Sequence, residues 1–172
     1  VASRHGNVLI FAPLCVARQT VGEAHKFGID VNYCRDMNGV LPGVNITNYE
    51  MLEEFDLSQF AGVVLDESDI ISSRDGKTRN ALIEQSVSVP YKLCCTATPS
   101  PNDFMELGNQ VEFLGIMSMV EMLATYFTHD GGETSKWKLK GHGRVKFWEW
   151  MATWSVVIRN PADIGFDGSR YI

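Results

Sequence analysis

Residues 63–69 are Val63-Val64-Leu65-Asp66-Glu67-Ser68-Asp69. The apolar run that opens this stretch is typical of a strand buried on both faces, and it leads directly into two adjacent acids. A single carboxylate is enough to anchor Mg²⁺, which keeps several of its waters, and a neighbouring carboxylate can orient or deprotonate a water. The stretch therefore indicates either a metal-binding strand end or a solvated acidic turn.

A second apolar run ends in hydroxyl groups. Leu93-Cys94-Cys95 is followed by Thr96-Ala97-Thr98-Pro99. If this strand neighbours the first, the hydroxyls of Thr96 and Thr98 can hydrogen-bond a carboxylate there. Taken alone, the segment predicts only a strand-ending turn, but the two segments together predict a site.

Short apolar runs alternate with amphipathic segments along the chain. We expect strands at 7–12, 29–34, 43–47, 60–65 and 91–96, and helices at 16–27, 49–55, 78–86, 102–113 and 120–127. This alternation predicts an α/β fold, a parallel sheet with helices on both faces. Functional residues of such sheets gather at the carboxyl ends of the strands, where the polar clusters fall here: Pro13-Leu14, Thr47-Asn48, Asp66-Glu67 and Thr96-Ala97-Thr98.

The composition changes after Phe127, which predicts an α/β lobe over 1–128 and an appendage over 129–172. Residues 131–172 hold seven basic and four acidic side chains, whereas the whole chain has a net charge of -6. The appendage is expected to be a basic hairpin followed by an aromatic helix. Its Lys138 and Lys140 could contact phosphates, or the hairpin could simply be solvated.

The 172 residues are 45% hydrophobic, which excludes disorder as the main state. No apolar stretch is long enough to span a bilayer, and the N-terminus shows no signal-peptide pattern. The four cysteines lack the spacing of zinc ligands and are expected to be reduced thiols. We therefore expect a cytoplasmic protein that does not contact a membrane.

Several segments resemble, in order, those of the DEAD/DEAH-box helicases of superfamily two. Asp66-Glu67-Ser68-Asp69 resembles motif II, Thr96-Ala97-Thr98 resembles motif III, and Ala12-Pro13-Leu14 with Gln19 resembles motif Ia. Residues 44–50 resemble a segment of Swi/Snf-type translocases. A group of phage and prophage Swi/Snf-like helicases is similar also at residues 75–82, 100–108, 137–142 and 159–163.

The resemblance implies a RecA-like first lobe of an ATP-dependent DNA translocase, encoded by a phage or prophage. Asp66 would hold Mg²⁺ through water and Glu67 would activate the water that attacks ATP. Thr96, Ala97 and Thr98 would couple hydrolysis to movement. Duplex DNA would lie near four residues, Pro13, Leu14, Thr47 and Asn48. A second RecA-like lobe would complete the motor.

The sequence departs from the family in one respect: its 172 residues contain no match to the phosphate-binding Walker A loop. Gly76-Lys77-Thr78 matches only the end of that pattern, because Ile71 stands where the first glycine is required. We expect the true loop before Val1 and the second lobe after Ile172. The lobe would then be incomplete at its N-terminus, and the isolated chain would be a weak ATPase or none, since backbone amides and a lysine would be missing from the phosphates.

Two alternatives remain open. The chain could be a non-catalytic lobe that binds DNA or protein and has a dead nucleotide site. It could also belong to another nucleotide hydrolase or a small α/β enzyme with an unrelated substrate. DNA-stimulated ATP turnover by the full-length protein would separate these possibilities.

Overall fold

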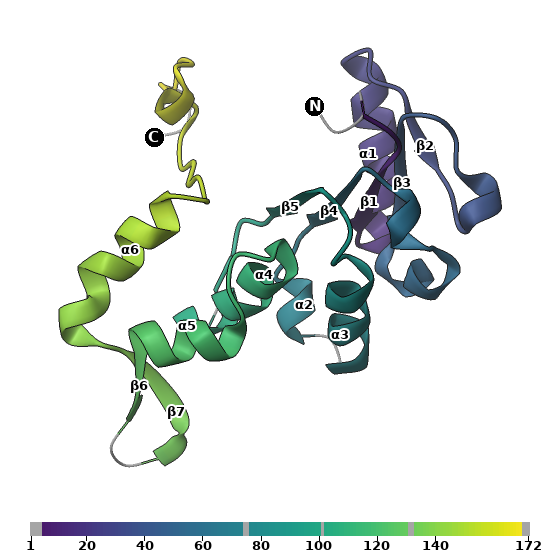
Figure 1. Ribbon diagram of the computed structural model, residues 1–172. Coiled ribbons are helices and arrows are strands. Elements are labelled where there is room, and N and C mark those ends of the chain that lie inside the picture. Colours follow the sequence, from purple (N-terminus) through teal and green to yellow (C-terminus); the bar gives the residue numbers. More distant parts are fainter. Residues whose placement is uncertain (1–4, 74–75, 101, 131–132, 170–172) are drawn as a thin grey trace. The chain divides into compact units, whose positions relative to one another are not determined.

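Five parallel strands form the central sheet of the computed structural model, which describes residues 5–73, 76–100, 102–130 and 133–169 (Figure 1). The strands are β1 (Val8–Ala12), β2 (Val31–Tyr33), β3 (Val44–Asn48), β4 (Gly62–Asp66) and β5 (Tyr91–Cys95). Their order is β2-β3-β1-β4-β5, and every neighbouring pair is parallel. The α/β fold with a parallel sheet, predicted from the alternating pattern, is confirmed, and so is the RecA-like arrangement that the family resemblance implies.

Strand β1 is apolar on both sides and lies between two cores, one on each face of the sheet. Leu9 and Phe11 of β1 belong to the larger core, whereas Ala12 packs with Ala17 of helix α1 in a second core. The helices of the region are α1 (Leu14–Lys26), α2 (Ile70–Ser73), α3 (Gly76–Gln85), α4 (Leu107–Leu114) and α5 (Met119–Tyr126), with 3-10 helices at η2 (Met37–Gly39), η3 (Tyr49–Glu54), η4 (Leu57–Gln59) and η5 (Phe104–Glu106).

Two predicted helices differ from the structure in a way that local chemistry explains. Helix α1 begins directly after Pro13, whose fixed φ suits the entry to a helix, rather than at Val16. Residues 49–54 form a 3-10 helix that ends before Phe55, which has extended backbone with a φ of -123°. Gly28 ends the α1 segment in the left-handed region, at a φ of 69°, which suits a glycine.

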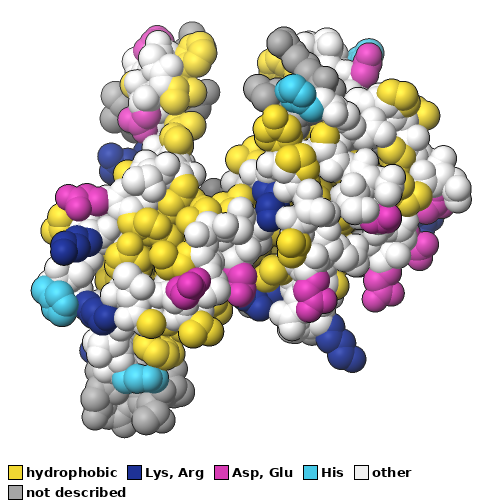
Figure 2. Space-filling view, in the orientation of Figure 1, with side chains coloured by type: hydrophobic (Ala, Val, Ile, Leu, Met, Phe, Trp, Pro, Cys, Tyr) yellow, Lys and Arg dark blue, Asp and Glu magenta, His cyan; other side chains and the backbone are white. Residues whose placement is uncertain are grey.

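The chain divides into two compact units, Val1–Leu123 and Ala124–Ile172, which we call unit 1 and unit 2. The division lies within helix α5, and strand β6 follows the last residue of that helix directly. Acidic side chains are spread over unit 1 in the space-filling view (Figure 2). Among the described residues, no helix is both long enough and apolar enough to cross a membrane.

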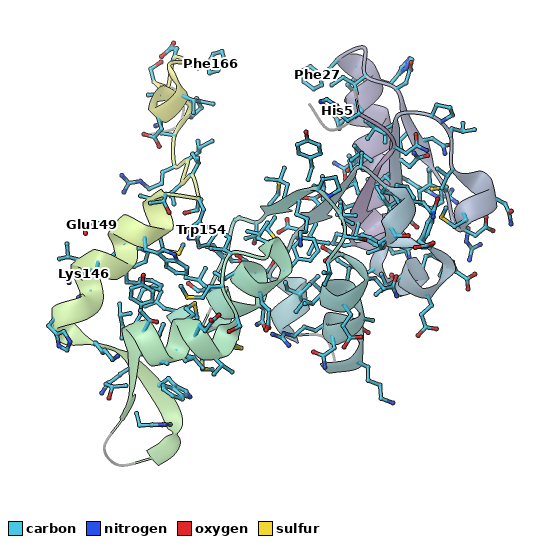
Figure 3. All side chains as sticks on the ribbon, in the orientation of Figure 1. His5, Phe27, Lys146, Glu149, Trp154 and Phe166 are labelled. Atoms are coloured by element: carbon cyan, nitrogen blue, oxygen red, sulfur yellow. The ribbon has the colours of Figure 1, made fainter. Side chains whose placement is uncertain are left out.

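Unit 2 consists of an antiparallel hairpin and an aromatic helix. The hairpin pairs β6 (Phe127–Asp130) with β7 (Glu133–Leu139), and α6 (Arg144–Ala152) follows, flanked by 3-10 helices η6 (Gly141–Gly143) and η7 (Pro161–Ile164). Phe147 is fully buried, with its ring 5.8 Å from that of Phe127 and 5.4 Å from that of Tyr126. Lys146 and Glu149 project from α6, and Trp154 follows its last turn (Figure 3).

Candidate functional site at the carboxyl ends of β4 and β5

The register of the sheet brings the acidic stretch and the threonine stretch together. Asp66, the last residue of β4, pairs with Cys95, the last residue of β5. Beyond this pair the backbone contact continues, because the amide of Ser68 donates to the carbonyl of Cys95 at 2.9 Å. The two strands are therefore neighbours, which is the condition under which the hydroxyls of the second segment can reach a carboxylate of the first.

Glu67 leaves the strand in an unusual backbone conformation. Its φ is 50°, the one positive φ of a non-glycine residue in the described ranges. The left-handed region is strained for a side chain with a Cβ, and such strain concentrates at functional sites. The turn breaks the alternation of the strand, so the Glu67 side chain is exposed immediately after the half-buried Asp66.

Asp69 joins the two strand ends. Its Oδ1 accepts from the Thr96 hydroxyl at 3.1 Å, and its Oδ2 accepts from the Thr98 hydroxyl at 3.2 Å. Thr96 Oγ1 also accepts from the amide of Thr98 at 3.0 Å, which closes the turn around the exposed Ala97. We call Asp69, Thr96 and Thr98 the clamp. The expected hydroxyl–carboxylate contact is present, but the acceptor is Asp69 rather than Asp66 or Glu67.

Tyr49, which directly follows β3, holds the end of β4 in place. Its hydroxyl donates to the carbonyl of Asp66 at 2.8 Å, and its ring stacks on Phe11 with centroids 5.8 Å apart. Tyr49 belongs to the segment 44–50 that resembles Swi/Snf-type translocases, but its residue type alone predicts no contact with Asp66. One sequence signal could have pointed to Tyr49. It is an aromatic residue with a hydroxyl directly after a predicted strand, and the carboxyl ends of parallel strands meet at one edge of the sheet.

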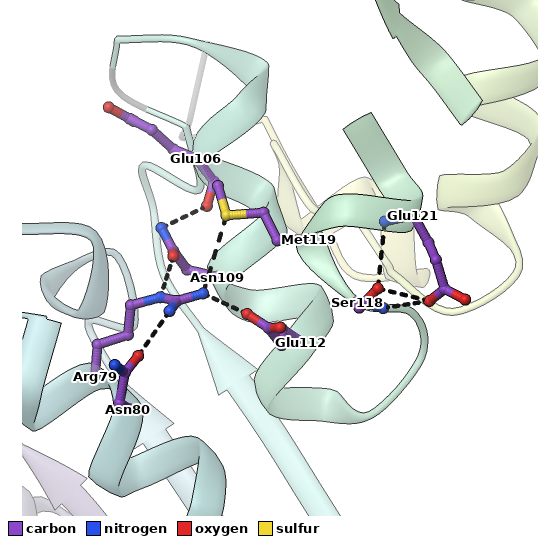
Figure 4. Close-up of polar contacts among 8 residues, drawn as sticks. All are labelled: Arg79, Asn80, Glu106, Asn109, Glu112, Ser118, Met119 and Glu121. Carbon is purple, nitrogen blue, oxygen red and sulfur yellow. Dashed lines mark hydrogen bonds and ion pairs between the residues drawn. The ribbon is translucent and has the colours of Figure 1, made fainter. Parts of the chain in front are cut away.

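A polar network connects α3 to α4 (Figure 4). The Arg79 guanidinium donates to Asn109 and forms an ion pair with Glu112. From the same helix α4, Gln110 donates to the carbonyl of Pro99 at 3.4 Å. Helix α4 therefore contacts α3 through Arg79 and the loop after β5 through Gln110.

The glycine–lysine–threonine triplet does not have the structural context of a phosphate-binding loop, which lies between a strand and a helix. Gly76, Lys77 and Thr78 form the first turn of α3, and the described element before them is helix α2 rather than a strand. The structural context agrees with the reading of this triplet as a chance match.

The residues expected near DNA on the sheet fall into two pairs. Leu14 is exposed and Pro13 half-buried at the carboxyl end of β1, where α1 begins. Thr47 and Asn48 are buried, and the Asn48 side chain is hydrogen-bonded to Tyr33 and Glu50 at 3.2 and 2.7 Å. The side chains of the second pair are therefore held inside the protein in this structure.

The two lysines expected to contact phosphates differ in their surroundings. Lys140 donates to the carbonyls of Ala124 and Thr125 at 2.8 and 2.9 Å, so it caps the end of helix α5. Lys138 is exposed on β7, opposite Thr128. Lys140 thus has a structural role, whereas the surface near Lys138 remains accessible.

The thiols near the site are protonated at neutral pH. Burial raises the pKa of Cys94 to about 12, and burial together with the Asp66 carboxylate raises the pKa of Cys95. In the described ranges, no three His, Cys, Asp or Glu side chains lie close enough to hold a metal ion together. Asp66 and Glu67 fit Mg²⁺ only if nucleotide phosphates and waters complete its oxygen shell, which is the usual manner of binding for this ion.

Comparison with known proteins yields a structural match alone. No protein-family model matches the chain, and no curated protein is similar to it in sequence. The fold is similar to a solved structure from Sulfolobus solfataricus, the SWI2/SNF2 ATPase core in complex with double-stranded DNA, with a TM-score of 0.54 and 22% identity. The similarity covers 70% of this chain and 27% of that chain, so this chain spans about a quarter of its neighbour's length.

Proposed function

We propose that this chain is part of the first ATPase lobe of an ATP-dependent DNA translocase of the Swi/Snf-like type that its sequence resembles. The observation that carries the proposal is the clamp: Asp69 accepts both threonine hydroxyls directly beyond the Asp66-Glu67 pair. The acidic pair alone is compatible with a solvated turn. Asp69, by contrast, joins the ends of β4 and β5. Such a contact is useful in a site where a structural change at the end of one strand must be transmitted to the end of the other.

Each residue has a separate part in the proposed mechanism. Asp66, held at its carbonyl by Tyr49, presents one carboxylate as an anchor for Mg²⁺ through water. Glu67 presents an exposed carboxylate that can orient and accept a proton from the attacking water. Bound Mg²⁺ would neutralise charge on the phosphates of ATP. Thr96 and Thr98 are hydrogen-bonded to Asp69. A movement of the acidic stretch would therefore also move the loop after β5.

The phosphate-binding loop is proposed to come from a segment outside these 172 residues. Support comes from β5, an edge strand of the described sheet, where Leu93 is 52% exposed and Tyr91 is 40% exposed. A parallel sheet of this class is normally covered on both faces. A further strand and helix beside β5 would bury these side chains and bring a loop to the same edge as Asp66.

Duplex DNA is the proposed track. The structural neighbour was solved with double-stranded DNA, and the accessible Leu14 lies on the same edge of the sheet as the clamp. A second RecA-like lobe in the same protein would complete the DNA path and the nucleotide site. Thr47 and Asn48 would act here by shaping β3, since their side chains are internal.

A non-catalytic docking lobe is the second candidate. The observation in its favour is that no G-x-x-x-x-G-K-[ST] pattern occurs in the 172 residues. The same lobe could then bind DNA or protein without turning over ATP.

The discriminating experiment is ATP turnover by the intact gene product with and without duplex DNA. The proposal predicts Mg²⁺-dependent turnover that rises when duplex DNA is added. DNA binding without any turnover would favour the docking lobe, and turnover indifferent to DNA would favour an unrelated hydrolase.

A further inference from the structure

Basic side chains gather where helix α6 begins. His142, Arg144 and Lys146 are all exposed there, and the space-filling view shows blue and cyan side chains in this part of unit 2 (Figure 2). Residues 131–172 hold seven basic and four acidic side chains, whereas the whole chain has a net charge of -6. The cationic character is therefore local to this part of the sequence.

These cations occupy an unfavourable place in the helix. The N-terminal end of a helix carries partial positive charge, so acids stabilise its first turn and cations destabilise it. The first turn of α6 contains no acid and begins with Arg144. Within the part of the chain that the structure describes, neither Arg144 nor Lys146 forms an ion pair. A sequence that breaks a local stability rule in this way is expected at a functional surface.

Glu149 is the one acid of α6, and it projects from the same side as Lys146 (Figure 3). In a helix, a lysine that precedes a glutamate interacts with it less favourably than one that follows it. Glu149 therefore compensates the positive charge of Lys146 only weakly. Arg144 lies four residues before Trp148, on the same face of the helix. Trp148 is 41% exposed and Val145 is 67% exposed, which adds apolar surface beside the guanidinium.

We infer that the start of α6 binds the sugar–phosphate backbone of DNA, with Arg144 and Lys146 reaching phosphates from opposite sides of the helix end and Trp148, on the side of Arg144, lying against the sugars. The inference rests on the proposed function, and it assigns to unit 2 a DNA contact separate from the sheet edge. It also moves the expected contact from Lys140, which caps α5, to the two exposed cations of α6. A polyanion at this position would relieve the repulsion between Arg144, Lys146 and the helix end.

The test is fluorescence anisotropy of a labelled DNA duplex with the 172-residue chain, without nucleotide, over a range of salt concentrations. Each lost phosphate contact reduces the slope of log K against log salt by about 0.9. Arg144→Gln with Lys146→Gln should therefore lower the slope by about two and weaken binding at low salt by about tenfold or more. Lys26→Gln with Lys77→Gln removes the same charge from exposed positions of unit 1 and serves as the matched control.

The charge-conserving pair Arg144→Lys with Lys146→Arg should keep the slope of the wild type. Equal losses in the two glutamine pairs, or an unchanged slope in the α6 pair, would overturn the inference. Absence of duplex binding by the wild type at low salt would also overturn it. Because the assay contains no ATP, these outcomes are independent of whether the intact protein turns over ATP.

Discussion

Thr96 donates its hydroxyl to Asp69 Oδ1 at 3.1 Å, across the ends of two neighbouring parallel strands. The same Thr96 oxygen accepts from the Thr98 amide. A single side chain thus both closes its own turn and holds the acidic stretch, so changes at Asp69 are transmitted to the loop after β5.

Replacement of Thr96 by valine should lower the free energy of unfolding by about 1 kcal/mol, because one hydrogen bond is lost and the Thr98 amide loses its acceptor. Thr98→Val is the control, since Thr98 is exposed and water can replace its bond. Urea unfolding of both variants measures the difference. A Thr96→Val protein as stable as Thr98→Val would contradict the additional structural role of Thr96, which alone accepts from the Thr98 amide.

The left-handed backbone of Glu67 predicts an unusual ranking of substitutions. Glycine adopts a φ of 50° without strain, whereas alanine retains the cost of its Cβ. Glu67→Gly should therefore be more stable than Glu67→Ala, by up to about 1 kcal/mol after the larger entropy of the unfolded glycine chain is counted. In a helix or strand the order would be reversed. Thermal unfolding of the two variants is the measurement, and an alanine variant that is the more stable would show that Glu67 is not strained.

Arg79 and Glu112 should be energetically coupled. Both side chains are mostly buried, at 21% and 29% exposure, and their contact joins α3 to α4. A double-mutant cycle with Arg79→Gln and Glu112→Gln is expected to give a coupling energy of about 1 kcal/mol. The exposed pair Lys26–Glu23, at 2.7 Å, is the matched control and should show almost none. Equal coupling in the two cycles would mean that the α3–α4 contact contributes no more than a surface pair.

Stability should fall at alkaline pH through Cys94. Burial raises its pKa from 9.0 to about 12, so the folded thiol stays protonated while the unfolded thiol ionises. The unfolded state then binds fewer protons, and stability decreases as pH rises above 9. By pH 10 the loss from this group is about 1.4 kcal/mol relative to pH 8. Denaturant unfolding at both values should show a smaller decrease in Cys94→Ala, and an identical decrease would contradict the burial effect.

The fold could be predicted because its signals are local. Short, mostly apolar runs predicted β1, β4 and β5, and their alternation with helices predicted that the sheet is parallel. The clamp could be anticipated in part, since two hydroxyls at one strand end need an acceptor at the next. Its acceptor, Asp69, lies within the quoted acidic stretch but after the two acids that the motif emphasises.

Other features depend on contacts between residues far apart in sequence. Tyr49 reaches the Asp66 carbonyl, and Lys140 reaches the end of α5, only after the chain has folded. The burial of Thr47 and Asn48 is likewise set by the position of β3 inside the sheet. The positive φ of Glu67 is a consequence of the turn that leads β4 into the clamp, and its residue type gives no sign of it.

The central claim is that Glu67 activates water for ATP hydrolysis. The most direct test is Glu67→Gln in the intact gene product, with ATP turnover and nucleotide binding measured on the same preparation. The amide keeps the size of the side chain but cannot accept the proton, so turnover should be abolished while nucleotide binding is retained. Turnover equal to that of the wild type would contradict the assignment.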